Sequence, residues 1–184
     1  MQFLSEAERR AILELARQAV LEAVCHNRAV DPIPKEGVFE RRCGVFVTLH
    51  VRKKLHGCIG MIEPRENLGA SIVKCSVSAA LEDPRFSRMR PEEAHEAEIE
   101  VSLLSPLEKI RLEEIVIGKH GLVVENGPRR GLLLPQVAVE HSLDREAFLR
   151  ETCRKAGLPG EAWQNPETRL YGFTCELITE SQPG

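Results

Sequence analysis

Two neighbouring segments constrain the fold more than any other part of the chain. Residues 44–51 alternate apolar and polar side chains, three basic residues follow at 52–54, and residues 55–62 have the pattern of a returning strand. If residues 52–54 form a three-residue loop, Val51 lies opposite Leu55 and the apolar side chains share one face. A shift of one residue would mix apolar and polar side chains on both faces. The sequence therefore predicts a β-hairpin in this register.

The polar face of this hairpin brings together side chains that are capable of chemistry. In the predicted register His50 lies opposite His56, and Thr48 lies opposite Cys58, so that Cys58 is diagonal to His50. A thiol is a nucleophile in its thiolate form, which nearby positive charge stabilises. We therefore expect Cys58 to be the nucleophile or redox thiol of a catalytic site, with His56 or His50 tuning it.

Three interpretations of residues 55–60 stay open on the sequence alone. The first is a packing point, where Gly57 and Gly60 let backbone approach closely and the cysteine is a small apolar side chain. The second is a reactive or ligand-sensing thiol, with the two glycines admitting a substrate or ligand. The third is a metal site formed by the two histidines and the cysteine, but no spacing in the chain names a fourth ligand. We expect no metal and no cofactor.

Periodic patterns elsewhere predict an α+β fold with a largely antiparallel sheet. Residues 5–8 have the spacing of a capping box, and helical periodicity follows to about His26. A second long helix is predicted over about 66–81, and Asp83-Pro84 ends it. Two long helices among at least six strands favour this fold class. The remaining predictions are strands at 99–103, 121–125, 131–134 (stopped by Pro135) and 170–179, and a helix from Asp144 to Ala156.

Composition and charge exclude several classes of function. The net charge is -3 and the pI is near 6.1, whereas a general nucleic-acid binder shows a basic excess, so nucleic-acid binding is not expected. No apolar run is long enough to span a membrane, and the N-terminus lacks the pattern of a signal peptide. The six cysteines include no CxxC pair, which favours reduced thiols and a cytoplasmic protein.

Three further residues are candidates for ligand binding, each with a structural alternative. Arg85 could bind a carboxylate or phosphate, or form a local ion pair with Asp83 at a helix-end turn. His120, at the entry to a strand, is a candidate general base, or a local hydrogen-bonding group. Gln136 could present its amide to a ligand, or bond loop backbone. The basic loop at 52–54 adds the expectation of a small anionic ligand.

Several spaced motifs, in order, resemble those of the AMMECR domain family over nearly the whole chain. The family's central marker is Leu-Arg-Gly-Cys-Ile-Gly, and residues 55–60 match it except at His56, where the family usually has arginine. A permanent cation is thereby replaced by a titratable one, which argues against a fixed anion clamp at this position. Because arginine is not a metal ligand, the family pattern also weakens the metal interpretation. The supporting matches are Asp83-Pro84-Arg85-Phe86, Val101-Ser102-Leu103-Leu104-Ser105-Pro106, Gly118-Lys119-His120-Gly121, Leu134-Pro135-Gln136-Val137 and Lys155-Ala156-Gly157-Leu158.

The resemblance implies one domain over residues 1–184, with an α+β fold in two unequal lobes. The hexapeptide of residues 55–60 would lie near the cleft between them. The larger lobe would come from the N- and C-terminal parts and the smaller from an insertion. Prokaryotic members often occur alongside Memo-like proteins and radical SAM enzymes, which implies a shared pathway. One hypothesis is therefore a thiol-dependent enzyme component acting through Cys58. The other is a non-catalytic protein- or ligand-binding module with a structural hairpin.

Overall fold

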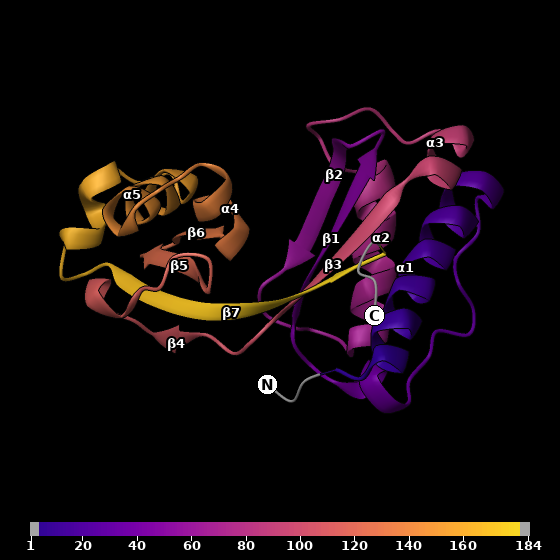
Figure 1. Cartoon of the computed structure of the whole chain (residues 1–184), viewed down its shortest axis with the longest axis horizontal. Coiled ribbons are helices and arrows are strands. Elements are labelled where there is room, and N and C mark those ends of the chain that lie inside the picture. Colours follow the sequence, from indigo (N-terminus) through magenta and orange to yellow (C-terminus); the bar gives the residue numbers. More distant parts are fainter. Residues whose placement is uncertain (1–3, 181–184) are drawn as a thin grey trace. The chain divides into compact units, whose positions relative to one another are not determined.

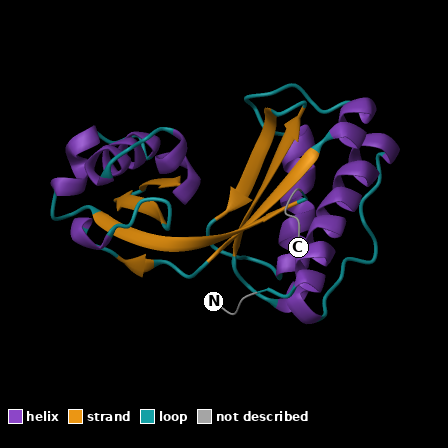
Figure 2. Cartoon of the chain, in the orientation of Figure 1, coloured by secondary structure: helices purple, strands orange, loops and turns teal. Residues whose placement is uncertain are grey.

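The structure of the chain is a computed structural model that describes residues 4–180. These residues form two compact units (Figure 1). One consists of the chain up to Leu104 together with the stretch from Glu176 onward, and the other is Ser105–Cys175. Both units combine helices with antiparallel strands (Figure 2), which confirms the predicted α+β class.

The first unit packs two long helices against a sheet. These helices are α1 (Glu6–His26) and α2 (Leu68–Leu81), and they contact strands β1 (Gly44–Val51), β2 (Lys54–Met61) and β3 (Glu98–Leu104). The strands are antiparallel in the order β2-β1-β3, so β2 forms an edge of the sheet. The position of β2 at this edge decides how its backbone is satisfied, as described below.

Local signals account for the helix boundaries in this unit. The hydroxyl of Ser5 accepts from the backbone N–H of Glu8, and the Glu8 carboxylate accepts from the Ser5 N–H, so the predicted capping box is present. The helix α2 begins at Leu68 because the Asn67 side chain caps it by accepting from the Ala70 N–H. The core between helices and sheet includes the buried side chains of Ile12, Leu15, Ala16, Val45, Val47, Leu49, Leu68, Ile72, Ile99 and Val101.

The second unit has shorter elements and a smaller core. Strand β5 (His120–Asn126) pairs with β6 (Arg129–Leu133) and with β7 (Arg169–Thr179), and β4 (Glu108–Lys109) also pairs with β7, all antiparallel. Its core cluster is formed by the buried side chains of Ile115, Leu122, Ala138, Phe148 and Leu149. Only the part of β7 up to Cys175 belongs to this unit. The helices of the unit are α4 (Pro135–Glu140), α5 (Arg145–Lys155), η2 (Leu112–Glu114) and η3 (Gly160–Gln164).

The hairpin of β1 and β2 has the predicted register over most of its length. Five pairs, from Val45 opposite Met61 to Leu49 opposite Gly57, are those expected from the segregation of apolar side chains. Val45, Val47 and Leu49 are buried, which confirms that this face packs against the helices.

The predicted register is wrong at the loop end of the hairpin. The turn consists of two residues, Arg52 and Lys53, whose φ angles are 51° and 63°. Two consecutive positive φ angles match the twist of antiparallel strands in a two-residue hairpin turn. His50 therefore pairs with Leu55, and His56 becomes the extra residue of a bulge. As a consequence Leu55 is 40% exposed instead of buried.

Two short helices escape prediction from the sequence. They are α3 (Pro91–Glu96) and α4, and each has six residues, too few to display helical periodicity. Pro135 ends the preceding strand as predicted, but it also occupies the first turn of α4, where its missing N–H costs nothing. None of the helices within residues 4–180 is long and apolar enough to cross a membrane.

Candidate functional site

The backbone on either side of Cys58 is fixed by the packing of two glycines. A Cβ at Gly57 would overlap the carbonyl oxygen of Ala79 in α2, and a Cβ at Gly60 would overlap the ring of Phe46. Gly57 therefore lets α2 approach the edge strand, and Gly60 makes room for an aromatic ring on the opposite face of the sheet. Both glycines have packing causes, and their role in admitting a ligand remains a prediction.

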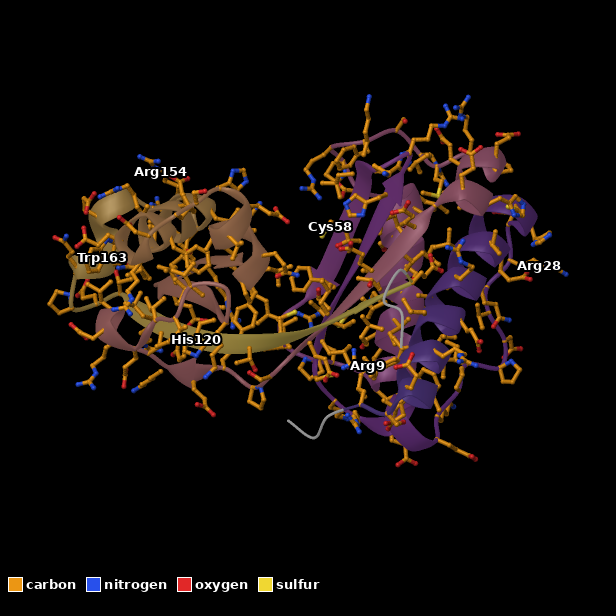
Figure 3. The ribbon with its side chains drawn as sticks, viewed as in Figure 1. Arg9, Arg28, Cys58, His120, Arg154 and Trp163 are labelled. Carbon is orange, nitrogen blue, oxygen red and sulfur yellow. The ribbon has the colours of Figure 1, made fainter. Side chains whose placement is uncertain are left out.

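Cys58 lies in the middle of the edge strand with its side chain on the face opposite α2 (Figure 3). Its pairing partner is Thr48, as predicted. The Thr48 hydroxyl donates to the Cys58 sulfur, with an Oγ1–Sγ distance of 3.2 Å. The cysteine is half-buried and forms no disulfide. Its thiol is thus held in one orientation while it stays within reach of solvent.

Asp83 and Arg85 hold both backbone groups of Cys58. The Cys58 N–H donates to Asp83 Oδ2 at 2.9 Å, and Arg85 Nη2 donates to the Cys58 carbonyl at 3.1 Å. These groups point away from β1, as in a non-hydrogen-bonded pair of an antiparallel ladder. The loop after α2 therefore replaces the missing neighbouring strand at this point, and we call the pair Asp83 and Arg85 the edge clamp.

The edge clamp is itself internally bonded. The Asp83 carboxylate accepts from the backbone N–H of Arg85 at 3.1 Å and from its guanidinium at 3.0 and 2.7 Å. The local ion pair between these two residues, one of the alternatives at the sequence level, is therefore present. A carboxylate that receives a two-point guanidinium contact fixes the orientation of the arginine.

The electrostatics of the clamp favour its charged form. The guanidinium of Arg85 holds the pKa of the buried Asp83 carboxyl well below its usual range, and the Cys58 N–H lowers it further. Asp83 in turn raises the pKa of Arg85, and the ionised Cys58 sulfur adds to that rise. The fixed guanidinium of Arg85 thus lies close to the Cys58 side chain. The Arg85 side chain is 51% exposed, so a small anion in solvent can reach it.

His56 contacts the loop of the edge clamp. Its ring stacks on Phe86, with centroids 6.3 Å apart and planes at 19°, and the Arg85 guanidinium lies 5.3 Å from the centre of the same Phe86 ring. The Nε2 atom of His56 is buried and has no hydrogen-bond partner among residues 4–180. The pKa of Glu93 is lowered to about 2, chiefly by hydrogen bonds from Arg90, and His56 contributes to this. His56 therefore belongs to the surroundings of Cys58.

His50 does not pair with His56, which corrects the predicted arrangement. It lies opposite Leu55 on β2 and Glu98 on β3, because the bulge shifts the register. No group of three or more histidine, cysteine, aspartate or glutamate side chains in the described chain is arranged to hold a metal ion, and His50, His56 and Cys58 form no such group. The catalytic roles predicted for these histidines remain predictions.

His120, the candidate general base, lies at the start of β5 in the second unit (Figure 3). Its Nδ1 accepts from the backbone N–H of Val116 at 3.2 Å. Burial lowers the pKa of His120, and the charge of Lys119 lowers it further. These contacts agree with the structural alternative, in which His120 is a local hydrogen-bonding group.

We expect the titration of His120 to show this burial. Its pKa should lie below the ordinary value of about 6.5. Because the charged form is disfavoured in the folded state, the stabilisation is fully present above that value and is lost as the pH falls through the lowered pKa. NMR titration of the imidazole, with urea unfolding at several pH values, measures both effects. A midpoint at or above 6.5, or an unchanged pH dependence in His120→Gln, would contradict this assignment.

Gln136 lies in the first turn of α4, also in the second unit. Its Oε1 atom is buried and accepts no hydrogen bond from the described residues. This oxygen therefore does not bond loop backbone, which was the structural alternative. A ligand-binding role for Gln136 remains a prediction.

The connection between Asp83 and Cys58 is the part of the site that sequence reasoning missed. The two residues are far apart in the sequence, and nothing in either local pattern indicates that one accepts from the backbone of the other. The signal was the motif Asp83-Pro84-Arg85-Phe86. Asp83 and Arg85 bond the backbone of Cys58, and Phe86 stacks on His56 in the same strand.

Comparisons with known proteins agree with the motif resemblance. A family model described as AMMECR1 matches residues 13–178. A protein of Methanothermobacter thermautotrophicus is 43% identical over 96% of this chain and 96% of its own, and one of Thermococcus gammatolerans is 43% identical over 94% and 90%. The crystal structure of protein PH0010 from Pyrococcus horikoshii has a TM-score of 0.87 and 39% identity, and covers 94% of this chain and 91% of that one. The chain belongs to the AMMECR1 family.

Proposed function

We propose that this protein is a cytoplasmic, thiol-dependent component of a pathway that it shares with Memo-like and radical SAM proteins, and that Cys58 is the reacting group. The observation that carries the proposal is the edge clamp, which fixes both backbone groups of a half-buried cysteine. The association of prokaryotic family members with the two partner classes supports the pathway.

The surroundings of the sulfur suit a nucleophilic or redox thiol. Positive charge beside a thiol favours the reactive thiolate, and Arg85 supplies a charge that is fixed by Asp83. The Thr48 hydroxyl donates a hydrogen bond to the sulfur. Because the Arg85 side chain is half exposed, it could also receive the carboxylate or phosphate of an anionic substrate.

A second candidate function is a non-catalytic module that binds a protein or a small ligand. The observation that favours it is the packing of Gly57 against α2 and of Gly60 against Phe46, which explains both glycines without a substrate. On this account residues 55–60 have only a structural role, and the protein or ligand binds elsewhere on the surface.

A strain in which the chromosomal gene carries Cys58→Ser tests the proposal. Metabolite profiles of this strain, of the wild type and of a gene deletion are compared, with Cys25→Ser as the matched control because Cys25 is another half-buried free cysteine. We expect Cys58→Ser to reproduce the profile of the deletion and Cys25→Ser to match the wild type. A Cys58→Ser strain that matches the wild type while the deletion differs would support the binding module instead.

Affinity capture tests the proposed partners separately. The full chain, with Memo-like and radical SAM proteins from the same organism, should form a complex that Cys58→Ser leaves intact. Absence of any complex in a reducing buffer would remove the pathway part of the proposal, but not the role of the thiol.

A further inference from the structure

A hollow of about 720 Å³ lies in the second unit, away in the sequence from the hexapeptide. It opens where β4 and β7 separate, just after the Ile110 N–H donates to the Leu170 carbonyl at 3.2 Å. The apolar side chains that line it also pack against the core of this unit, and they are Ile110, Leu112, Trp163 and Leu170. This volume lies within the range of small-molecule sites, and the apolar part of the lining would contact the ligand.

Trp163 gives the hollow a flat aromatic surface. It comes from the short helix η3 and is labelled in Figure 3. Its side chain is among those that line the hollow, and its indole N–H is buried and has no hydrogen-bond partner in the described chain. Indole faces stack well on other flat rings. The lining therefore favours a ligand with a ring system.

The rim of the hollow carries two cations that pair with nothing else. Within residues 4–180 the side chains of Lys109 and Arg169 make no hydrogen bond or ion pair, and both residues are exposed. Arg111, also on the rim, is instead bound to Glu114 at 3.3 Å. Glu113, also on the rim, offsets one of the two unpaired positive charges, so the rim keeps a net positive charge. An anionic group at the rim would find charge-assisted donors on both sides.

We infer that this hollow binds a small amphipathic anion, with a flat apolar ring system against Trp163 and a carboxylate between Lys109 and Arg169. A second hollow in the same unit, of about 610 Å³, is lined by Leu133, Val137, Leu143 and Lys155 among others. Its lining includes the imidazole of His141 but no indole or phenyl ring, and its Arg154 is paired with Glu151. The second hollow therefore serves as an internal control for non-specific binding to apolar surface.

The test is an NMR titration of the full, ¹⁵N-labelled chain with 1-naphthoate. Trp163 is the only tryptophan, so a single indole N–H resonance reports on the hollow. We expect a saturable shift of that resonance, and about tenfold weaker binding of the neutral analogue 1-naphthylmethanol. The double variant Lys109→Gln with Arg169→Gln should lower the affinity for naphthoate to that of the neutral compound. Lys155→Gln, in the second hollow, should leave it unchanged.

Three outcomes would overturn the site: an indole resonance that does not move, equal affinity for the acid and the alcohol, or an affinity that falls with Lys155→Gln and not with the double variant. All three substituted side chains are exposed, so the variants are expected to fold, and their melting temperatures verify this. The result does not bear on Cys58, because naphthoate binding is measured at the other unit.

Discussion

Replacing Asp83 by alanine is expected to lower the free energy of unfolding by about 3 kcal/mol. The side chain is 2% exposed and accepts from the Cys58 N–H and from three donors of Arg85. Its removal leaves the edge strand without its acceptor and frees the guanidinium that holds the Cys58 carbonyl. Urea unfolding measures the loss. Asp144→Ala is the control, because Asp144 is an exposed helix cap whose loss costs about 1 kcal/mol.

The pH dependence of unfolding provides a second readout of Asp83. Because its folded pKa is depressed, the stabilisation is fully present above the unfolded value of about 3.9 and is lost as the pH falls toward the folded value. The wild type should therefore lose more stability below pH 4 than Asp83→Ala does. Equal losses in the two proteins, or a cost at neutral pH no larger than that of Asp144→Ala, would show that the edge clamp does not stabilise the strand.

Replacing Gly57 by alanine is expected to destabilise the protein by about 3 kcal/mol, and to reduce the yield of folded protein. The added Cβ meets backbone, namely the carbonyl of Ala79, so no side-chain rotation relieves the overlap, and either α2 or β2 must move. Urea unfolding and circular dichroism of the purified variant measure this effect.

Gly127→Ala is the control for this substitution. Gly127 has open space around its Cα but a φ of 57°, so alanine there is strained only in its backbone, at a cost of about 1 kcal/mol. If Gly57→Ala costs no more than Gly127→Ala, the glycine is not needed for helix packing. The interpretation in which it admits a ligand would then gain support.

The elements with long periodic patterns were predictable from the sequence. The capping box at Ser5, the hairpin register from Val45 to Leu49 and the final strand follow from local patterns that burial enforces. The loop end of the hairpin was not predictable in the same way. The two-residue turn requires positive φ angles at Arg52 and Lys53, which residues other than glycine adopt only rarely, so the sequence did not indicate it.

The candidate site was only partly predictable. The pairing of Thr48 with Cys58 follows from the register, and the ion pair of Asp83 with Arg85 follows from their spacing. The hydrogen bonds from this pair to the backbone of Cys58 depend on where the loop after α2 meets the sheet edge. Such long-range contacts are set by tertiary packing, and a single sequence without its structure does not encode them in any local pattern.

The most direct test of the central claim, that Cys58 is held as a reactive thiol, is the alkylation rate of each cysteine in the native protein. Iodoacetamide is added at pH 5–9, and peptide mass spectrometry reads the six sites. Burial raises the pKa of Cys75 to about 11 and also that of Cys153, so these two should be protected. Cys58 should react fastest of the six, and Arg85→Gln should slow it while Arg111→Gln does not. If Cys58 stays inert until the protein unfolds, the hexapeptide is architecture and the proposed thiol function is wrong.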